Sequence, residues 1–244
     1  MKVLEKRNPI ILIHGLWNTS SIFSSITPQL DNIGIEYFAP TLEHSYGMTS
    51  ILDLTNKLNE LIKYHKWLST TGIKTGLISP KNEQFIWDEF IVHSLYFAKI
   101  ITEMPEMVEE ISDLGTGGGI PGVAIGITTD IKVNLIDIKE KRVFELSRLL
   151  KILDQKNMFS LQQDAEDYIK NGGFFVSRCF ISSENVLNNI KKDKKTTYLV
   201  SSTGENIEYD NNLFHVKHEK FNINKNDIRP VSYTHLTLPT ILRV

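Results

Sequence analysis

A glycine-rich run at residues 113–122 constrains the fold of this chain more than any other part of it. The run reads D-L-G-T-G-G-G-I-P-G, follows a short apolar segment that ends at Ile111, and precedes apolar residues at 123–127. Glycine permits a tight turn and lets a ligand approach bare backbone. Pro121 suits the first turn of a helix, where its missing N–H costs nothing. The run therefore predicts a strand, a glycine turn and the start of a helix.

A second apolar segment, at residues 133–136, follows the expected helix and ends in Asp137. A carboxylate at the end of that strand can accept hydrogen bonds from the hydroxyls of a ribose. The amino end of the helix adds unpaired N–H groups and a partial positive charge. The turn, the helix start and the acid together predict a pocket for a nucleoside cofactor.

The identity of the nucleoside depends on details of the glycine turn. Gly117, Gly119 and Gly122 satisfy the dinucleotide pattern G-x-G-x-x-G, with an acid about twenty residues further on. Two features favour S-adenosylmethionine over NAD. Asp113 precedes the glycines, where its carboxylate can face the cationic end of the cofactor. Pro121 and the three consecutive glycines shape a wider loop than a pyrophosphate clamp needs. A glycine turn that binds no ligand is the remaining alternative.

Short motifs along the middle of the chain form a recognisable series. They are G-L-I-S-P at 76–80, F-I-W-D at 85–88, H-S-L at 93–95, the glycine run, L-I-D-I-K-E-K-R-V at 135–143, D-A-E-D at 164–167 and V-S-R-C-F at 176–180. With these motifs, residues from about 58 to about 222 resemble the bacterial small-subunit (16S) rRNA guanine-N7 methyltransferase G family, also known as glucose-inhibited division protein B. The resemblance covers about two thirds of the chain.

The resemblance implies an α/β fold, a Rossmann-like class I S-adenosylmethionine methyltransferase sheet with helices on both faces. It also implies that small-subunit rRNA, or a nascent ribosomal subunit, is the partner. Guanine N7 carries a free lone pair and no proton, so its attack on a methyl group needs no general base. Positioning and desolvation can supply the catalysis. No catalytic side chain and no metal site is therefore expected.

The resemblance assigns contacts within the cofactor site as well. Asp137 would hold the ribose. Ala165 and Glu166 would flank the adenine through their backbone and the Glu166 side chain. Arg178 would lie beside the methionine end of the cofactor or beside the entering base. With the glycine turn included, the expected cofactor-binding set is Asp113, Gly115, Gly117, Gly119, Ile120, Asp137, Ala165, Glu166 and Arg178.

Several positions depart from the family pattern. They are Thr71 and Gly72 in place of Trp-Asn, Gly76 in place of Asn, Glu89, Phe90 and His93 within the R-H-x-x-D-S segment, and Thr203 in place of Lys. The change from Arg to Glu89 reverses a charge on the side expected to meet rRNA. These departures keep two hypotheses open: an impaired rRNA methyltransferase, or a degenerate module that binds cofactor without turnover. His93 is expected to be a satisfied, partly buried histidine, with a new acid or ligand as the alternative.

The first 57 residues have a different character. Residues 10–13 predict a β-branched-rich strand that ends in His14-Gly15, and residues 35–39 predict a second strand. This pattern resembles the opening of an α/β-hydrolase, whose chemistry needs a nucleophile and a histidine partner. The chain contains no G-x-S-x-G, so this segment is interpreted as a partial α/β-hydrolase-like fragment. Hydrolase activity, carried only by His14-Gly15 and Trp17, is the third hypothesis.

Alternating strands and helices predict a parallel sheet after this fragment. The expected methyltransferase domain covers 58–230 and is truncated at its carboxyl end. Residues 231–240 resemble translated adapter read-through, so the tail 231–244 is given no functional weight. The expected strands lie near 110–114, 133–137, 158–162, 174–178 and 197–201, with a late strand at 215–223.

The net charge and the cysteine content limit which partners and which cellular compartment the sequence predicts. The net charge is −2, which gives no global basic signature for RNA. Basic runs at 139–151 and 191–195 can meet phosphate, although a solvated surface is the simpler interpretation of each run. The single cysteine, Cys179, excludes an internal disulfide and fits a reducing cytoplasm. No apolar run reaches membrane-spanning length and no signal-peptide core occurs, so a cytoplasmic monomer without a membrane partner is expected.

Overall fold

The computed structural model describes the chain as two compact units, residues 1–58 and 59–244. The described residues are 10–12, 20–35, 37–38, 51–104, 107–153, 155–180, 196–201, 214–224 and 227–237. The first unit contains the parallel pair β1 (Ile10–Ile11) and β2 (Tyr37–Phe38), the 3-10 helix η1 (Ser20–Phe23) and the helix α1 (Thr27–Asn32). The two short strands fall inside the two expected ones. His14-Gly15 and Trp17 lie outside the described residues, so the hydrolase-like assignment stays a prediction.

The second unit is built on a seven-stranded sheet with the order β5-β4-β3-β6-β7-β9-β8. The strands from β5 to β7 along this order are parallel, and β9 is antiparallel to both β7 and β8. The bounds are β3 Glu110–Leu114, β4 Lys132–Asp137, β5 Met158–Gln162, β6 Gly173–Ser177, β7 Thr196–Ser201, β8 Phe214–Asn224 and β9 Asp227–Thr237. Every strand expected in this unit is present within one residue of its predicted bounds, and the parallel sheet is confirmed.

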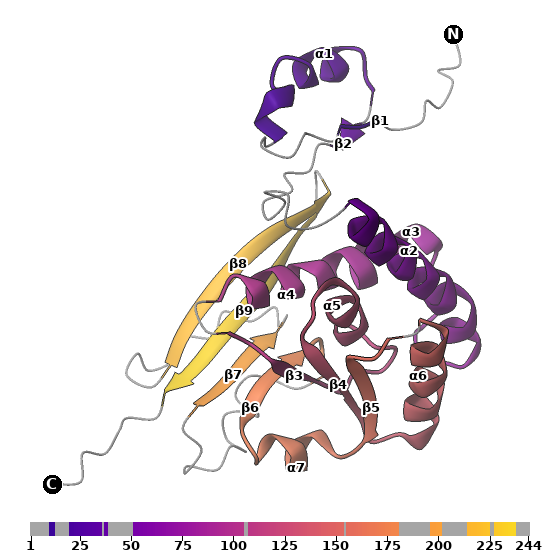
Figure 1. Ribbon diagram of the computed structural model, residues 1–244, viewed down its shortest axis with the longest axis vertical. Coiled ribbons are helices and arrows are strands. Elements are labelled where there is room, and N and C mark those ends of the chain that lie inside the picture. The colour runs from indigo at the N-terminus through magenta and orange to yellow at the C-terminus, as the bar shows by residue number, and fades with distance from the viewer. Residues whose placement is uncertain are drawn as a thin grey trace, which may run out of the picture. The chain divides into compact units, whose positions relative to one another are not determined.

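Helices cover both faces of this sheet, as the sequence predicts (Figure 1). One face carries parts of α2, α4, α5 and α6, and the opposite face carries α7. The helix bounds are α2 Ile51–Trp67, α3 Glu83–Ile86, α4 His93–Thr102, α5 Gly122–Thr128, α6 Glu140–Ile152 and α7 Ala165–Ile169, with π-helical turns η2 Leu68–Gly72 and η3 Trp87–Val92.

The strands contribute side chains to the hydrophobic clusters on both faces of the sheet, because successive side chains of a strand point to opposite sides. Ile111, Val133 and Leu135 pack into the larger hydrophobic cluster with the four helices. Their neighbours Leu114 and Ile136 pack into the smaller cluster with α7. Strands buried on both faces usually have near-continuous apolar sequence. In β4, Val133, Leu135 and Ile136 supply it, and the buried Asn134 interrupts it.

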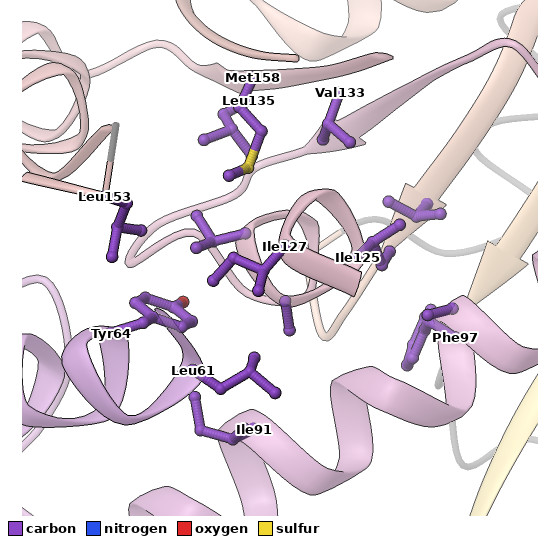
Figure 2. Packing of buried hydrophobic residues seen from close by; sticks show 14 of the residues in the cluster. Leu61, Tyr64, Ile91, Phe97, Ile125, Ile127, Val133, Leu135, Leu153 and Met158 are labelled. Carbon is purple, nitrogen blue, oxygen red and sulfur yellow. The ribbon is translucent and has the colours of Figure 1, made fainter. Parts of the chain in front are cut away.

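Helix α5 lies at the centre of the larger cluster (Figure 2). Its Ile125 and Ile127 are 0% and 4% exposed and lie between β4 residues and the side chains of α2 and η3, such as Leu61 and Ile91. Each buried side chain of this size stabilises the fold by about 1.5–3 kcal/mol. Because α5 begins directly after the glycine turn, the turn is joined to a helix whose residues 122–127 are all buried.

The carboxyl-terminal strand β9 extends into the predicted tail. Ser232 pairs with Ser201 and Thr237 pairs with Thr196, so residues 231–237 belong to the sheet. The division of the chain into 1–57, 58–230 and 231–244 stays a prediction. Among the described residues, no helix combines the length and apolar character that crossing a bilayer requires.

Candidate functional site

The expected site residues gather at the edge of the sheet formed by the carboxyl ends of its parallel strands. Asp113 near the end of β3 is in register with Leu135 of β4 and with Val176 of β6. Asp137 ends β4 in register with Gln162 of β5. The chain order reverses between β3 and β6, and open α/β sheets bind ligands at such a switch point. The topology therefore brings together the glycine turn, Asp137, the start of α7 and the segment after β6.

The glycine turn has the backbone that its sequence predicts. Gly115, Gly117 and Gly119 have φ values of +67°, +58° and +88°, in the left-handed region where other residues are strained. The N–H of Thr116 donates to the carbonyl of Ile136 at 3.0 Å, which ties the turn to β4. The carbonyl of Thr116 in turn accepts from the N–H groups of Gly119 and Ile120. The turn is thus held by its own backbone and by the neighbouring strand.

Asp113 fastens the glycine turn to helix α5. Its side chain is 0% exposed, and Oδ2 accepts from the Thr116 hydroxyl at 2.6 Å and from the Gly122 N–H at 2.8 Å. Its Oδ1 has no hydrogen-bond partner among the described residues. Burial raises the pKa of Asp113 to about 7, with a further contribution from Asp137, while the two hydrogen bonds oppose the shift. The expected contact of Asp113 with a cationic cofactor stays a prediction.

The amino end of α5 is occupied by the chain itself. The first N–H, of Gly122, is bonded to Asp113, and the N–H of Val123 donates to the carbonyl of Gly119 at 2.8 Å. The expectation that these groups are open to a ligand is therefore wrong for both. A Cβ added at Gly122 would lie 2.5 Å from Leu135 Cδ2 and 2.7 Å from the Asp113 carboxylate. Glycine is needed here because the helix approaches β3 and β4 so closely.

Tyr64 of α2 holds the glycine turn through a hydrogen bond to its backbone. Its hydroxyl donates to the carbonyl of Gly118 at 2.9 Å, and the residue is 0% exposed. Burial raises the pKa of Tyr64 well above its usual value; Asp113 adds to the shift and Arg178 opposes it. This contact was not predicted from the sequence. The only available signal was the helical spacing of the surrounding apolar residues, which does not separate a support of the turn from ordinary core.

Asp137 faces the glycine turn. Its Oδ2 accepts from the Gly117 N–H at 3.2 Å and from Arg142 Nη1 at 3.0 Å, and its Oδ1 accepts from the Lys139 N–H at 2.9 Å. The residue is 3% exposed. A ribose hydroxyl at this carboxylate would take the position of the Arg142 guanidinium, the partly exposed member of the set. Asp137 thus has the orientation expected of it, and its contact with ribose stays a prediction.

The residues expected beside adenine begin helix α7. Asp164 caps this helix, since its carboxylate accepts from the Glu166 N–H at 2.8 Å. Ala165 is 5% exposed, and the Glu166 side chain is exposed. The Glu166 N–H is therefore engaged in the cap, which leaves the Glu166 side chain and the backbone of Ala165 for the predicted adenine contact.

Glu89 is buried and Phe90 is partly exposed, so Glu89 does not present its charge to solvent. The prediction that this pair lies on the side that meets rRNA stays a prediction. Glu89 is 7% exposed and forms an ion pair with Arg178, Oε2 to Nη2, at 3.2 Å. Arg178 Nη1 also donates to the main-chain carbonyl of Glu89. The guanidinium lies over the Phe90 ring, 5.2 Å from its centroid. The pairing was missed because the partners are 89 residues apart in sequence.

The other departures from the family pattern give a mixed outcome. Gly72 is buried within η2, and its carbonyl accepts from the N–H groups of Leu77 and Ile78. His93 is 3% exposed with its ring edge-on to Phe97 at 5.6 Å, so it is more deeply buried than expected, and its satisfied role stays a prediction. Thr203 lies outside the described residues. So does the basic run at 191–195.

Comparison with known proteins decides the family. A model of the family GidB, rRNA small subunit methyltransferase G, matches residues 57–233. The chain belongs to this family. Proteins named ribosomal RNA small subunit methyltransferase G include one from Acidothermus cellulolyticus, 24% identical over 160 residues, which are 65% of this chain and 67% of that protein. Another, from Phocaeicola vulgatus, is 30% identical over 131 residues, 53% of this chain and 60% of the relative.

A third methyltransferase G relative, from Bacteroides thetaiotaomicron, is 31% identical over 121 residues, which are 49% of this chain and 58% of that protein. The chain thus spans between 58% and 67% of the length of these three relatives. Family membership and the strand order agree on a class I methyltransferase fold, which confirms the predicted fold class for the second unit.

Proposed function

We propose that this chain is an S-adenosylmethionine-dependent methyltransferase that acts on guanine N7 of small-subunit rRNA. One observation carries the proposal: the glycine turn, Asp137, the start of α7 and the Arg178 segment meet at the switch point of a sheet whose chain belongs to the methyltransferase G family. A cytoplasmic location and a monomeric state are part of the same proposal.

The residues at this edge fit such a cofactor. Among the residues that the structure describes, a Cβ at Gly117 would meet only the Gly115 carbonyl, at 3.8 Å, which leaves room for a ligand beside this part of the turn. The carboxylate of Asp137 lies against the Gly117 N–H, where a ribose can be held. The buried Oδ1 of Asp113 offers an unused acceptor beneath the turn. These groups can bind and orient a nucleoside that carries a positive charge.

Methyl transfer to guanine N7 requires no catalytic side chain. S-adenosylmethionine supplies an electrophilic methyl group on a sulfonium, and guanine N7 supplies the lone pair. No proton has to be removed, so the chain needs to hold the two reactants in line and exclude water. The turn and Asp137 fix the nucleoside end. Arg178, directly after β6, is the residue proposed to meet the entering base or the methionine end.

A module that binds cofactor without turnover is the second candidate. Its support is the set of departures at the substrate side, of which Glu89 and Gly72 are buried and contact other parts of the protein. Glu89 pairs with Arg178, and the Gly72 carbonyl accepts backbone hydrogen bonds, so both residues stabilise the fold of the protein itself. The two candidates still differ in a simple measurement.

Transfer of a labelled methyl group from S-adenosylmethionine to small ribosomal subunits, and to free small-subunit RNA, tests the proposal. We expect label in RNA that is cleaved at a single N7-methylguanine by reduction and aniline treatment. Asp137→Asn should lower transfer at least tenfold, whereas Glu110→Gln, at the opposite end of the neighbouring strand, should not. Cofactor binding without label in either RNA would favour the second candidate, and label at another atom would contradict the proposed specificity.

A further inference from the structure

The segment after β6 covers one side of the glycine turn. A Cβ added at Gly115 would lie 2.1–2.4 Å from atoms of the Phe180 ring, so the ring rests directly on this glycine. Phe180 is 53% exposed. Its ring therefore fills the space beside Gly115 while about half of the residue's surface remains exposed. A ligand that contacts Gly115 has to displace this ring.

Arg178 anchors the same segment to η3. Its guanidinium makes a charge-assisted pair with the Glu89 carboxylate and also donates to the Glu89 carbonyl, and it lies over the Phe90 ring. The two side chains of the ion pair are only 12% and 10% exposed. Charge-assisted bonds in such surroundings are stronger than ordinary surface pairs. Glu89 sits in a π-helical turn, a feature that recurs at functional sites.

Cys179, which lies between Arg178 and Phe180, has an unusual backbone conformation. Cys179 has a φ of +55°, in the left-handed region that non-glycine residues rarely adopt. Such a conformation persists only where the flanking structure holds it. Here one flank is the Arg178 pair with Glu89 and the other is the contact of Phe180 with Gly115. Loss of the anchor removes one of the two constraints on Cys179.

We propose that Glu89 is a positioning residue of the cofactor site: through Arg178 it holds Phe180 as a cover over Gly115. The cover and a ligand at Gly115 compete for the same space. Glu89 therefore sets the fraction of molecules open to ligand, and weakening it favours the open state. The identity of the ligand rests on the proposed function, whereas the link from Glu89 to Phe180 does not.

A nitroxide attached to Cys179, which is exposed and is the single cysteine of the chain, reports the mobility of this segment. In Glu89→Gln we expect the ratio of mobile to immobile spectral components to rise about tenfold, because one charge-assisted hydrogen bond is lost. Glu145→Gln is the matched control, since Glu145 is 9% exposed in its side chain and pairs with Arg148 on α6. Glu89→Asp should restore much of the immobile component.

The association rate of S-adenosylmethionine is measured by stopped-flow fluorescence on the unlabelled protein. Partial unfolding of the variant would not increase this rate, so an increase separates opening of the site from loss of structure. The rate should increase about tenfold in Glu89→Gln and stay within about twofold of wild type in Glu145→Gln. If Glu89→Gln does not fold, the double variant Glu89→Gln with Arg178→Gln leaves no buried unpaired charge and should show the same mobile spectrum. Unchanged mobility in a folded variant would overturn the proposal. If wild type binds no S-adenosylmethionine, the proposed function fails, while the spectra still decide the role of Glu89.

Discussion

Replacing Asp113 by Asn tests the role of the buried carboxyl beneath the glycine turn. Burial raises the pKa of Asp113 from 3.8 to about 7 in the folded chain. A folded-state pKa above the unfolded value means that the contribution to stability is complete below about pH 3.8 and is lost as the pH rises through 7. A tenfold change in proton affinity corresponds to about 1.4 kcal/mol, so the rise in the pKa of Asp113 corresponds to roughly 4 kcal/mol.

The assay is urea unfolding of wild type and Asp113→Asn at intervals from pH 4 to pH 8.5. Subtracting the two curves cancels the other titrating groups, and the asparagine keeps an acceptor for Thr116 and Gly122. The free energy of unfolding of wild type, relative to the variant, should fall by roughly 4 kcal/mol between pH 4 and pH 8 and then level off. Glu110→Gln is the control.

The control is expected to give the opposite sign. Burial acts to raise the pKa of Glu110, but hydrogen bonds from Asn134 and Lys132 outweigh it, and the pKa is lowered. The wild type should therefore gain stability over Glu110→Gln as the pH rises through the acid range. A difference between wild type and Asp113→Asn that does not vary with pH would refute the reasoning. A difference that rises with pH would mean that the ionised carboxylate is the form that the turn stabilises.

Three further substitutions follow from the contacts of the site, each measured by urea unfolding at pH 7. Gly122→Ala should cost about 1–3 kcal/mol, because its methyl group would lie 2.5 Å from a Leu135 carbon, and a cost near zero would contradict the close approach. Glu89→Arg should destabilise by about 3–5 kcal/mol, because it leaves two buried arginines facing each other, and it should lower methyl transfer where the family pattern alone predicts a gain. Tyr64→Phe should cost about 0.5–1.5 kcal/mol for the lost bond to the turn, and equal stability would mean that the hydroxyl is not a support.

Local sequence was enough to predict the strands and the turn. The strands are short segments that contain apolar residues and are flanked by turn residues, and the central strands β3 and β4 are buried along nearly their whole length. The glycines at positions with positive φ were visible in the same way, because few other residues adopt that backbone. Asp113 and Asp137 were also visible, since an acid at the end of a parallel strand in this fold lies beside the turn by topology alone.

Contacts between distant segments could not be predicted. Glu89 was interpreted as a reversed surface charge because a family pattern gives each position separately and does not show its partner. The structure places Arg178 beside it, so the same charge becomes a buried structural element. Phe180 against Gly115 is another such contact, since it depends on where the chain turns after β6. The role of Asp113 was predicted only in part, because the sequence shows its place and not its bonds to Thr116 and Gly122.

The most direct measurement is a calorimetric titration of the whole chain with S-adenosylmethionine, repeated for Asp137→Asn and Glu110→Gln. We expect a single site in wild type, the same site in Glu110→Gln, and a dissociation constant raised at least tenfold in Asp137→Asn, where the carboxylate beside Gly117 is lost. No heat of binding in wild type, or equal affinity in Asp137→Asn, would contradict the claim that this edge of the sheet holds the cofactor.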